Sequence, residues 1–213
     1  MSLKVDIQAM QQQMLPSIPK EALATMQQAT QDLIDSHIAE QAKHIDQRAP
    51  NFTLSNTKNE HFTLSKQLKH GSVVLNFYRG RWCPYCQLEL HALHKIMPSI
   101  HELGAQLVSI CPNTHEQSSQ FMQENPFDFD ILIDQDNHVA KQFNLVFKLG
   151  DDLQAIYQQF GIDLPDYDGN DRYELPIPAT YIINPQGIIT HSFINPDYTQ
   201  RMEPEAILQA LQS

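Results

Sequence analysis

An apolar, β-branched segment runs directly into a pair of cysteines, and this junction constrains the fold more than any other feature of the chain. Residues 73–78 read Val-Val-Leu-Asn-Phe-Tyr, the composition of a buried central strand. After the short turn at residues 79–82, the sequence Cys-Pro-Tyr-Cys begins at Cys83 and opens a helical stretch. Pro84 suits the start of that helix, because a missing N–H costs little there. The chain is therefore expected to place two thiols where a buried strand meets a helix N-terminus.

Two cysteines at the start of a helix favour redox chemistry. The free N–H groups and partial positive charge of a helix N-terminus stabilise a thiolate, which is the nucleophile in disulfide exchange. Arg79 and Arg81 add positive charge beside Cys83 and Cys86. Helix geometry alone favours Cys83 as the attacking thiol, because its sulfur lies closest to the free N–H groups and to solvent. The sequence thus predicts a reversible dithiol–disulfide couple.

Two other interpretations of the cysteines remain open. Cys83 and Cys86 together with Cys111 and His115 supply four zinc ligands, although zinc sites do not usually follow a fully buried strand. The pair could also be buried thiols with no role. We expect neither a metal nor another cofactor, and we expect Cys111 to be a small buried residue at the end of a strand.

Composition narrows the class of protein. The chain has 213 residues, 14 Lys plus Arg against 25 Asp plus Glu, and a net charge of −11. That length suits one domain with an extension, and the acidic balance disfavours nucleic acid and anionic membranes as partners. Three cysteines are too few for a disulfide-dense secreted scaffold. No apolar stretch in the sequence is long enough to predict a membrane span. We expect a cytoplasmic protein.

Hydrophobic periodicity divides the chain near residue 48. Residues 1–48 predict one or two amphipathic helices, which form an N-terminal extension that packs on the main domain or on a second copy in a homodimer, and carry no candidate catalytic group. From residue 49 to 213, strand-like and helix-like patterns alternate, as in an α/β domain. The predicted strands are 51–54, 61–64, 72–78, 105–110, 129–133, 179–184 and 188–193. The predicted helices are 84–103, 116–124, 137–143, 151–159 and 203–211, and residues 161–171 are expected to form a loop.

Several motifs in this order resemble known proteins. Trp-Cys-Pro-Tyr-Cys after a strand resembles the active site of the thioredoxin superfamily. Ala-Pro-Asn-Phe-Thr-Leu at residues 49–54 is similar to the opening strand of the peroxiredoxins, the alkyl hydroperoxide reductase C and thiol-specific antioxidant family. Residues 178–187, Pro-Ala-Thr-Tyr-Ile-Ile-Asn-Pro-Gln-Gly, look like the penultimate hairpin of that family. The resemblance implies a thioredoxin fold, an α/β domain with a central mixed sheet flanked by helices.

The active-site register departs from the peroxiredoxin pattern. That family usually carries Pro-x-x-x-Thr-x-x-Cys, in which the last Cys attacks peroxide. On this chain Arg79 takes the Pro position, Cys83 the Thr position and Cys86 the attacking position. The register therefore favours Cys86 as the attacking thiolate, whereas helix geometry favours Cys83. We give the register more weight and predict Cys86.

The resemblance also implies the surroundings of the thiols. Pro178 falls where thioredoxins have a cis-proline, so Ile177 and Pro178 are expected to contact substrate. Arg201 resembles a second arginine found before the last helix of some peroxiredoxins, and it is expected to stabilise charge on the leaving oxygen together with Arg79 or Arg81. Trp82 is expected either to shield the dithiol and contact a partner or to serve as ordinary packing.

The function implied is a thiol peroxidase that reduces hydrogen peroxide or organic hydroperoxides through a Cys83–Cys86 disulfide. A thioredoxin-like protein or glutathione would restore the dithiol. One alternative is a general thiol–disulfide oxidoreductase, in which Cys83 would attack and Cys86 would resolve. Another is a redox-sensing or partner-binding domain that uses its N-terminal helices.

Overall fold

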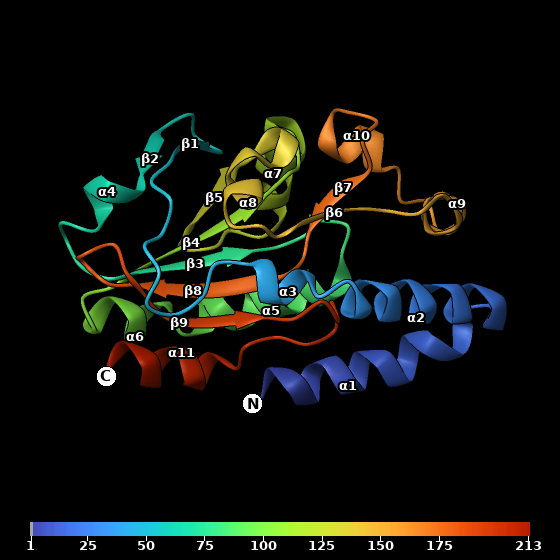
Figure 1. Ribbon diagram of the computed structural model, residues 1–213, viewed down its shortest axis with the longest axis horizontal. Helices are drawn as coiled ribbons and strands as arrows, with labels where there is room; N and C mark the ends of the chain where they lie inside the picture. Colours follow the sequence, from blue (N-terminus) through green and yellow to red (C-terminus); the bar gives the residue numbers. More distant parts are fainter. Residues whose placement is uncertain (1) are drawn as a thin grey trace.

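The central feature of the fold is a mixed sheet with strand β3 in its middle. The computed structural model describes residues 2–213, and within them seven strands pair in the order β2-β1-β5-β4-β3-β8-β9 (Figure 1). Strand β3 runs parallel to β4 and antiparallel to β8. The strands are β1 (Thr53–Asn56), β2 (His61–Thr63), β3 (Val73–Phe77), β4 (Gln106–Cys111), β5 (Asp130–Ile133), β8 (Ala179–Ile183) and β9 (Ile189–Ile194).

Helices flank this sheet and also precede it, as the sequence predicts for an α/β domain with an N-terminal helical extension. The N-terminal helices are α1 (Leu3–Met14), α2 (Lys20–Asp35) and α3 (Ile38–Gln41). The later helices are α4 (Leu64–Gln67), α5 (Pro84–Lys95), α6 (Met97–Glu102), α7 (His115–Glu124), α8 (His138–Gln142), α9 (Asp151–Gln159), α10 (Leu164–Asp168) and α11 (Pro204–Leu211). Short 3-10 turns lie at η1 (Leu15–Ser17) and η2 (Gln135–Asn137).

Two local predictions need correction, and two short strands were not predicted. The helix expected over 84–103 is divided at Ile96, since Pro98 cannot donate to the preceding turn and starts a new helix. The loop expected over 161–171 contains α10, which Asp163 caps by accepting a hydrogen bond from the Asp166 N–H. Strands β6 (Val146–Lys148) and β7 (Glu174–Pro176), which pair with each other, are too short to give a clear alternating pattern.

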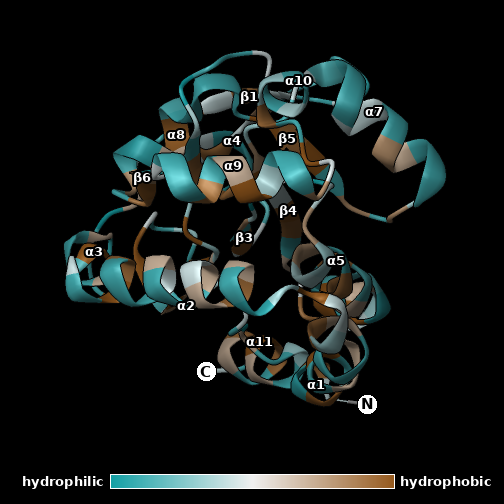
Figure 2. Cartoon of the chain, turned by 90° about the vertical axis from the view of Figure 1, so that its right-hand side faces the viewer, coloured by the Kyte–Doolittle hydropathy of each residue, from teal (hydrophilic) through white to brown (hydrophobic). Residues whose placement is uncertain are grey.

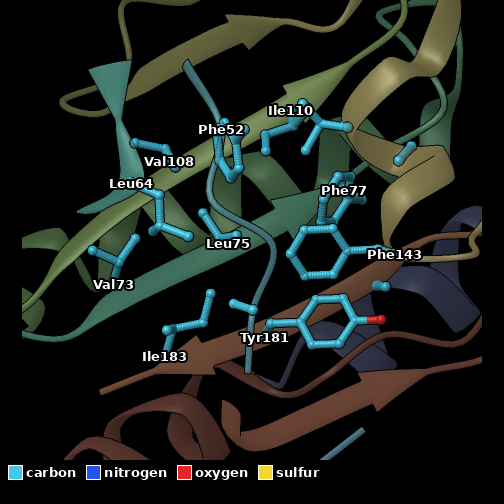
Figure 3. Close-up of a cluster of buried hydrophobic side chains, with 14 of the residues drawn as sticks. Phe52, Leu64, Val73, Leu75, Phe77, Val108, Ile110, Phe143, Tyr181 and Ile183 are labelled. Carbon is cyan, nitrogen blue, oxygen red and sulfur yellow. The ribbon is translucent and has the colours of Figure 1, made fainter. Parts of the chain in front are cut away.

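Alternation along β3 produces one apolar cluster on each face of the sheet. Leu75 and Phe77 point to the first cluster, where Phe77, Phe143 and Tyr181 pack with ring centroids 5.0–6.1 Å apart (Figure 3). Val74 and Tyr78 point to the second cluster, which contains Cys83, Cys86 and the buried sides of α5, α6 and α11. The two clusters hold β3 rigidly, and the turn that follows it carries the candidate site.

The N-terminal helices are integrated with both clusters. Leu3 and Ile7 of α1 are buried in the second cluster, and Ala42 is buried in the first. Glu203 accepts hydrogen bonds from the backbone N–H groups of Leu3 and Lys4, so the start of α1 meets the start of α11, and the two helices follow one another along the bottom of Figure 1. The boundary at residue 48 stays a prediction, but the extension shares its packing with the domain. Over residues 2–213, no helix is both long and apolar enough to cross a membrane.

Candidate active site

The turn after β3 is shaped by a glycine. Gly80 has φ of +146°, a backbone conformation that L side chains rarely adopt. A Cβ atom at this position would lie 2.6 Å from Nε1 of Trp82 and 2.8 Å from Nδ2 of Asn113. The turn therefore packs too closely for any residue other than glycine, and it delivers Cys83 to the N-cap of α5.

The thiol of Cys83 lies at the helix N-terminus, as the sequence predicts. Its Sγ accepts a hydrogen bond from the backbone N–H of Cys86 at 3.4 Å and another from Nη2 of Arg79 at 3.3 Å. Burial alone would raise the pKa of Cys83, but the hydrogen bond with Cys86 and the charges of Arg79 and Arg201 outweigh it. The pKa of Cys83 is held well below its ordinary value, which favours this sulfur as the thiolate of the pair.

Cys86 has the opposite character. Its pKa is raised well above the ordinary value by burial, by the hydrogen bond with Cys83 and by the negative charge there, although Arg201 and Arg79 partly offset these effects. We expected Cys86 to be the thiolate near neutral pH, whereas the directions of the two pKa shifts favour Cys83. Of the two cysteines, Cys83 is the one that occupies the N-cap and contacts the Arg79 guanidinium.

A buried ion pair between Arg201 and Glu89 contacts the thiol of Cys86. Nη2 of Arg201 donates to Sγ of Cys86 at 3.4 Å, and Nε of Arg201 donates to Oε2 of Glu89 at 2.7 Å. Both side chains of the ion pair are only 2% exposed. The placement of Arg201 at the thiols agrees with the sequence expectation. Sequence reasoning missed Glu89, although a carboxylate three residues after Cys86 on the same helix face was a usable signal.

Arg79 is held in an aromatic enclosure. Its Nη1 donates to Oη of Tyr157 at 2.9 Å, and its guanidinium lies 4.0 Å from the ring centroid of Tyr198 and 5.0 Å from that of Trp82. Within residues 2–213, Nε of Arg79 has no hydrogen-bond partner. This leaves one buried donor beside Cys83 for an incoming oxygen atom. Trp82 packs on Arg79 and on the ring of Tyr157, and its role as a shield of the dithiol stays a prediction. Nothing in the sequence pointed to Tyr157 or Tyr198.

Arg81, by contrast, is turned away from the thiols. Its guanidinium pairs with Glu124 at 2.7 Å and lies 5.9 Å from the ring centroid of Phe121. Its backbone N–H donates to Oδ1 of Asn113 at 2.9 Å. We expected Arg81 to join the positive charge around the dithiol, but its pairing with α7 occupies the guanidinium elsewhere.

Ile177 and Pro178 contribute to a pocket rather than to a cis-proline loop. No peptide bond among the described residues is cis, so the expectation of a cis bond before Pro178 is wrong. The backbone N–H of Ile177, which follows β7, donates to the carbonyl of Leu145, which precedes β6, at 2.8 Å. Both residues line a pocket of about 680 Å³ that reaches Arg79.

The third cysteine lies apart from the pair and is buried, as expected. Sγ of Cys111 lies 3.8 Å from Oγ of Ser118, and burial raises its pKa to about 11. Nδ1 of His115 lies 3.3 Å from Oγ of Ser119. Among residues 2–213, no group of three or more His, Cys, Asp or Glu side chains is arranged to hold a metal ion. The three cysteines are unpaired thiols.

Comparisons with known proteins agree with this geometry. The model of the AhpC/TSA family matches residues 45–192. A putative peroxiredoxin, bcp, from Helicobacter pylori (strain J99) is 28% identical over 151 residues, which cover 71% of this chain and 88% of the relative. The thiol-disulfide oxidoreductase ResA of Bacillus subtilis (strain 168) is 27% identical over 168 residues, covering 73% of this chain and 74% of the relative.

A solved structure has the same fold. The crystal structure of peroxidoxin BcpB from Mycobacterium tuberculosis superimposes with a TM-score of 0.60 at 20% identity, covering 79% of this chain and 96% of that chain. The central mixed sheet flanked by helices is therefore a thioredoxin fold, as the sequence predicts.

Proposed function

Because the chain belongs to the AhpC/TSA family, we propose that it is a thiol-dependent peroxidase in which Cys83 attacks the peroxide and Cys86 resolves the product. The observation that carries this assignment is the hydrogen bond from Nη2 of Arg79 to Sγ of Cys83. A thiolate is the nucleophilic form of cysteine, and of the two thiols Cys83 is the one whose pKa is lowered.

The first step forms a sulfenic acid on Cys83. The thiolate attacks the terminal oxygen of the peroxide, and the O–O bond breaks as the S–O bond forms. The departing alkoxide or hydroxide takes up one proton. This proton balances the one that Cys83 released on ionising. The unpartnered Nε of Arg79 is a donor for the negative charge that develops on that oxygen.

The second step closes the disulfide. The sulfur of Cys86 attacks the sulfur of the Cys83 sulfenic acid, the S–O bond breaks, and the hydroxyl group leaves as water with the Cys86 proton. Arg201 contacts Sγ of Cys86 and stabilises its negative charge as that proton departs. The raised pKa keeps Cys86 protonated until the first step is complete.

Access to the dithiol requires movement. Cys83 and Cys86 are both 0% exposed, and Arg79 stands between Cys83 and the pocket. Peroxide therefore reaches Cys83 when the Arg79 side chain or the Tyr198 ring over it shifts. Reduction by a thioredoxin-type protein or by glutathione needs a larger opening, because the donor sulfur has to attack the disulfide in line. A cytoplasmic location and a homodimer remain part of the proposal.

Single serine variants test the assignment. Cys86→Ser should form a sulfenic acid with peroxide, trapped by dimedone and detected by mass spectrometry, and should not close a disulfide. Cys83→Ser should form none. Cys111→Ser is the matched control, because Cys111 is equally buried but lies beside Ser118. It should turn over peroxide like the parent protein, and peptide mapping should find Cys111 free after oxidation.

The reverse behaviour of the two variants would assign the attack to Cys86. A protein that consumes no peroxide in the presence of a thiol reductant would contradict the peroxidase assignment itself.

The second candidate function is general thiol–disulfide exchange. The likeness to the oxidoreductase ResA and the Cys-Pro-Tyr-Cys sequence motivate it. The same Cys83 thiolate would then attack a protein disulfide. Reduction of insulin disulfides at a rate comparable to peroxide turnover would favour this function, whereas peroxide turnover alone supports the peroxidase.

A further inference from the structure

A pocket of about 680 Å³ separates the N-terminal extension from the domain that carries the thiols. Helix α2 forms one wall of the pocket, and the segment from β6 into α9 forms the other. Helices α2 and α9 lie one above the other in Figure 2. The apolar lining comes from both walls, with Met26, Ala29 and Leu33 on α2 facing Phe147, Leu149 and Leu153. The extension is thus part of a cavity, which its sequence did not suggest.

The inner end of this pocket lies at the reactive centre. Arg79, Tyr157 and Tyr198 all line it. Arg79 contacts Sγ of Cys83 at 3.3 Å and Tyr157 at 2.9 Å, so one side chain separates the pocket from the thiolate. A molecule bound in the pocket would hold its end against the group that positions Cys83.

The size of the pocket exceeds what hydrogen peroxide requires. A water molecule occupies about 30 Å³ in the liquid, and hydrogen peroxide is only slightly larger. Pockets of roughly 300–1,000 Å³ with apolar walls and a few polar groups at one end are typical of sites for small organic molecules. The volume and lining therefore suit a peroxide that carries an apolar body.

The charges around the pocket select against anions. The acidic residues that line the pocket are Asp32 of α2 and Asp151 and Asp152 of α9. The cationic lining residues are Lys148 of β6 and, at the inner end, Arg79. The charge of Arg79 at the inner end is directed at the Cys83 thiolate. A peroxide that carries a carboxylate would meet net negative charge on entry.

We propose that this pocket binds the apolar body of a neutral organic hydroperoxide and that α2 of the N-terminal extension sets the preference for such substrates. This proposal rests on the peroxidase function proposed above. The bound hydroperoxide would present its terminal oxygen to Cys83, the O–O bond would break, and the corresponding alcohol would leave through the pocket after taking up a proton.

A pair of tryptophan substitutions on one helix tests the proposal. Ala29→Trp fills the pocket, whereas Ala24→Trp adds the same side chain to α2 at an exposed position outside it. In Ala29→Trp, the ratio of kcat/KM for cumene hydroperoxide to that for hydrogen peroxide should fall about tenfold or more, the scale of steric discrimination in an apolar pocket. The ratio should not change in Ala24→Trp.

A binding measurement separates the failure of this proposal from failure of the peroxidase function. Calorimetry should show that cumyl alcohol, the reaction product, binds the unmodified protein and Ala24→Trp equally and binds Ala29→Trp at least several-fold more weakly. If the protein turns over no peroxide, the peroxidase function fails, and this binding result still decides whether the pocket accepts an apolar ligand.

A separate experiment tests the effect of the acidic residues that line the pocket. The triple variant Asp32→Asn, Asp151→Asn and Asp152→Asn should gain activity with linoleic acid hydroperoxide, an anion, relative to cumene hydroperoxide. An unchanged substrate ratio in Ala29→Trp would overturn the proposal. So would a selective loss of reduction by thioredoxin in that variant, because the pocket would then be a docking site for the reductant.

Discussion

The guanidinium of Arg79 donates a hydrogen bond to Sγ of Cys83 over 3.3 Å, and both groups are buried, at 4% and 0% exposure. Removed from water, the positive charge acts on the thiolate with little screening. The contact also joins the thiol to Tyr157, Trp82 and Tyr198 through the same side chain. One arginine therefore both lowers the pKa of Cys83 and lines the inner end of the pocket.

The first prediction concerns this contact. Arg79→Met should raise the pKa of Cys83, because the thiolate loses an adjacent opposite charge. The pH at which the reaction with peroxide reaches half its maximal rate should rise by the same amount, since the rate follows the thiolate fraction. Stopped-flow kinetics over a pH series, with thiolate absorbance as a second readout, measures both.

Arg81→Met is the matched control. Arg81 is two residues away in the sequence, but its guanidinium pairs with Glu124. Its replacement should leave the pH profile of the peroxide reaction where it is in the parent protein. Equal shifts in the two variants would mean that general positive charge, and not the Arg79 hydrogen bond, lowers the pKa.

The second prediction concerns the buried ion pair between Arg201 and Glu89, which contacts Cys86. Glu89→Gln leaves the Arg201 charge buried without its partner and should lower the free energy of unfolding by about 3–5 kcal/mol. The double variant Glu89→Met with Arg201→Met should recover most of that stability, because it buries no unpaired charge. It should close the disulfide more slowly, since Cys86 loses the Arg201 donor. Urea unfolding and the rate of disulfide closure measure the two effects.

The pair formed by Arg81 and Glu124 provides the comparison for burial. It has the same 2.7 Å separation as the Arg201–Glu89 pair, but the Glu124 side chain is 48% exposed. Glu124→Gln should cost less than about 1 kcal/mol. A similar cost for both glutamine variants would show that burial does not determine the strength of these pairs.

Local sequence predicted the parts of the site that neighbouring residues control. The strand at residues 73–77, the turn and the helix starting at Pro84 all follow from composition and from the position of proline. The capping position of Cys83 follows from the same pattern. The residue that contacts it, Arg79, is only four positions away. Such local relationships can be predicted from sequence because they depend only on one turn and one helix end.

Long-range partners could not be predicted in the same way. Tyr157 is 78 residues from Arg79, and the hydrogen bond between them forms only when the tertiary fold brings α9 to the turn after β3. Arg81 illustrates the opposite error, because closeness in sequence placed it beside the thiols while tertiary contacts with α7 turned it away. The preference for Cys86 over Cys83 as the thiolate has the same origin. A family register assigns positions but not the charges around them.

The third prediction concerns the turn at Gly80. Gly80→Ala should lower the free energy of unfolding by about 3 kcal/mol, combining backbone strain with the clash against Trp82 and Asn113. It should also slow the peroxide reaction, since Trp82 packs on Arg79. Gly161→Ala is the control, because Gly161 has φ of +74° with no atom within 4 Å of its Cβ position. It should cost only about 1–2 kcal/mol and leave the rate unchanged.

The last prediction concerns Asp168, a buried carboxyl at the end of α10. Its Oδ1 accepts a hydrogen bond from Nδ2 of Asn113 at 2.7 Å, and Oδ1 of Asn113 accepts from the N–H of Arg81. Burial raises the pKa of Asp168 from 3.8 to about 7, and the Asn113 hydrogen bond offsets only part of this effect. The folded state therefore binds a proton that the unfolded state has released throughout this pH range.

The sign of the pH dependence follows from that difference in bound protons. The contribution of Asp168 to stability is fully present below the unfolded pKa of 3.8 and is lost as pH rises to about 7. At about 1.4 kcal/mol per pKa unit, the total loss is on the order of 4 kcal/mol. Asp168→Asn keeps an acceptor for Asn113 but cannot ionise. It should match the parent protein in acid and exceed it in stability by up to that amount above neutral pH.

Urea unfolding at a series of pH values from acid to mildly alkaline checks this expectation. The difference in unfolding free energy between Asp168→Asn and the parent protein should grow with pH and become constant above about pH 7, where the folded carboxyl is also ionised. Asp171→Asn, at an exposed position three residues later, should show no such pH-dependent gain. A constant difference at every pH would mean that Asp168 ionises equally in the folded and unfolded states, and that its burial does not control its charge.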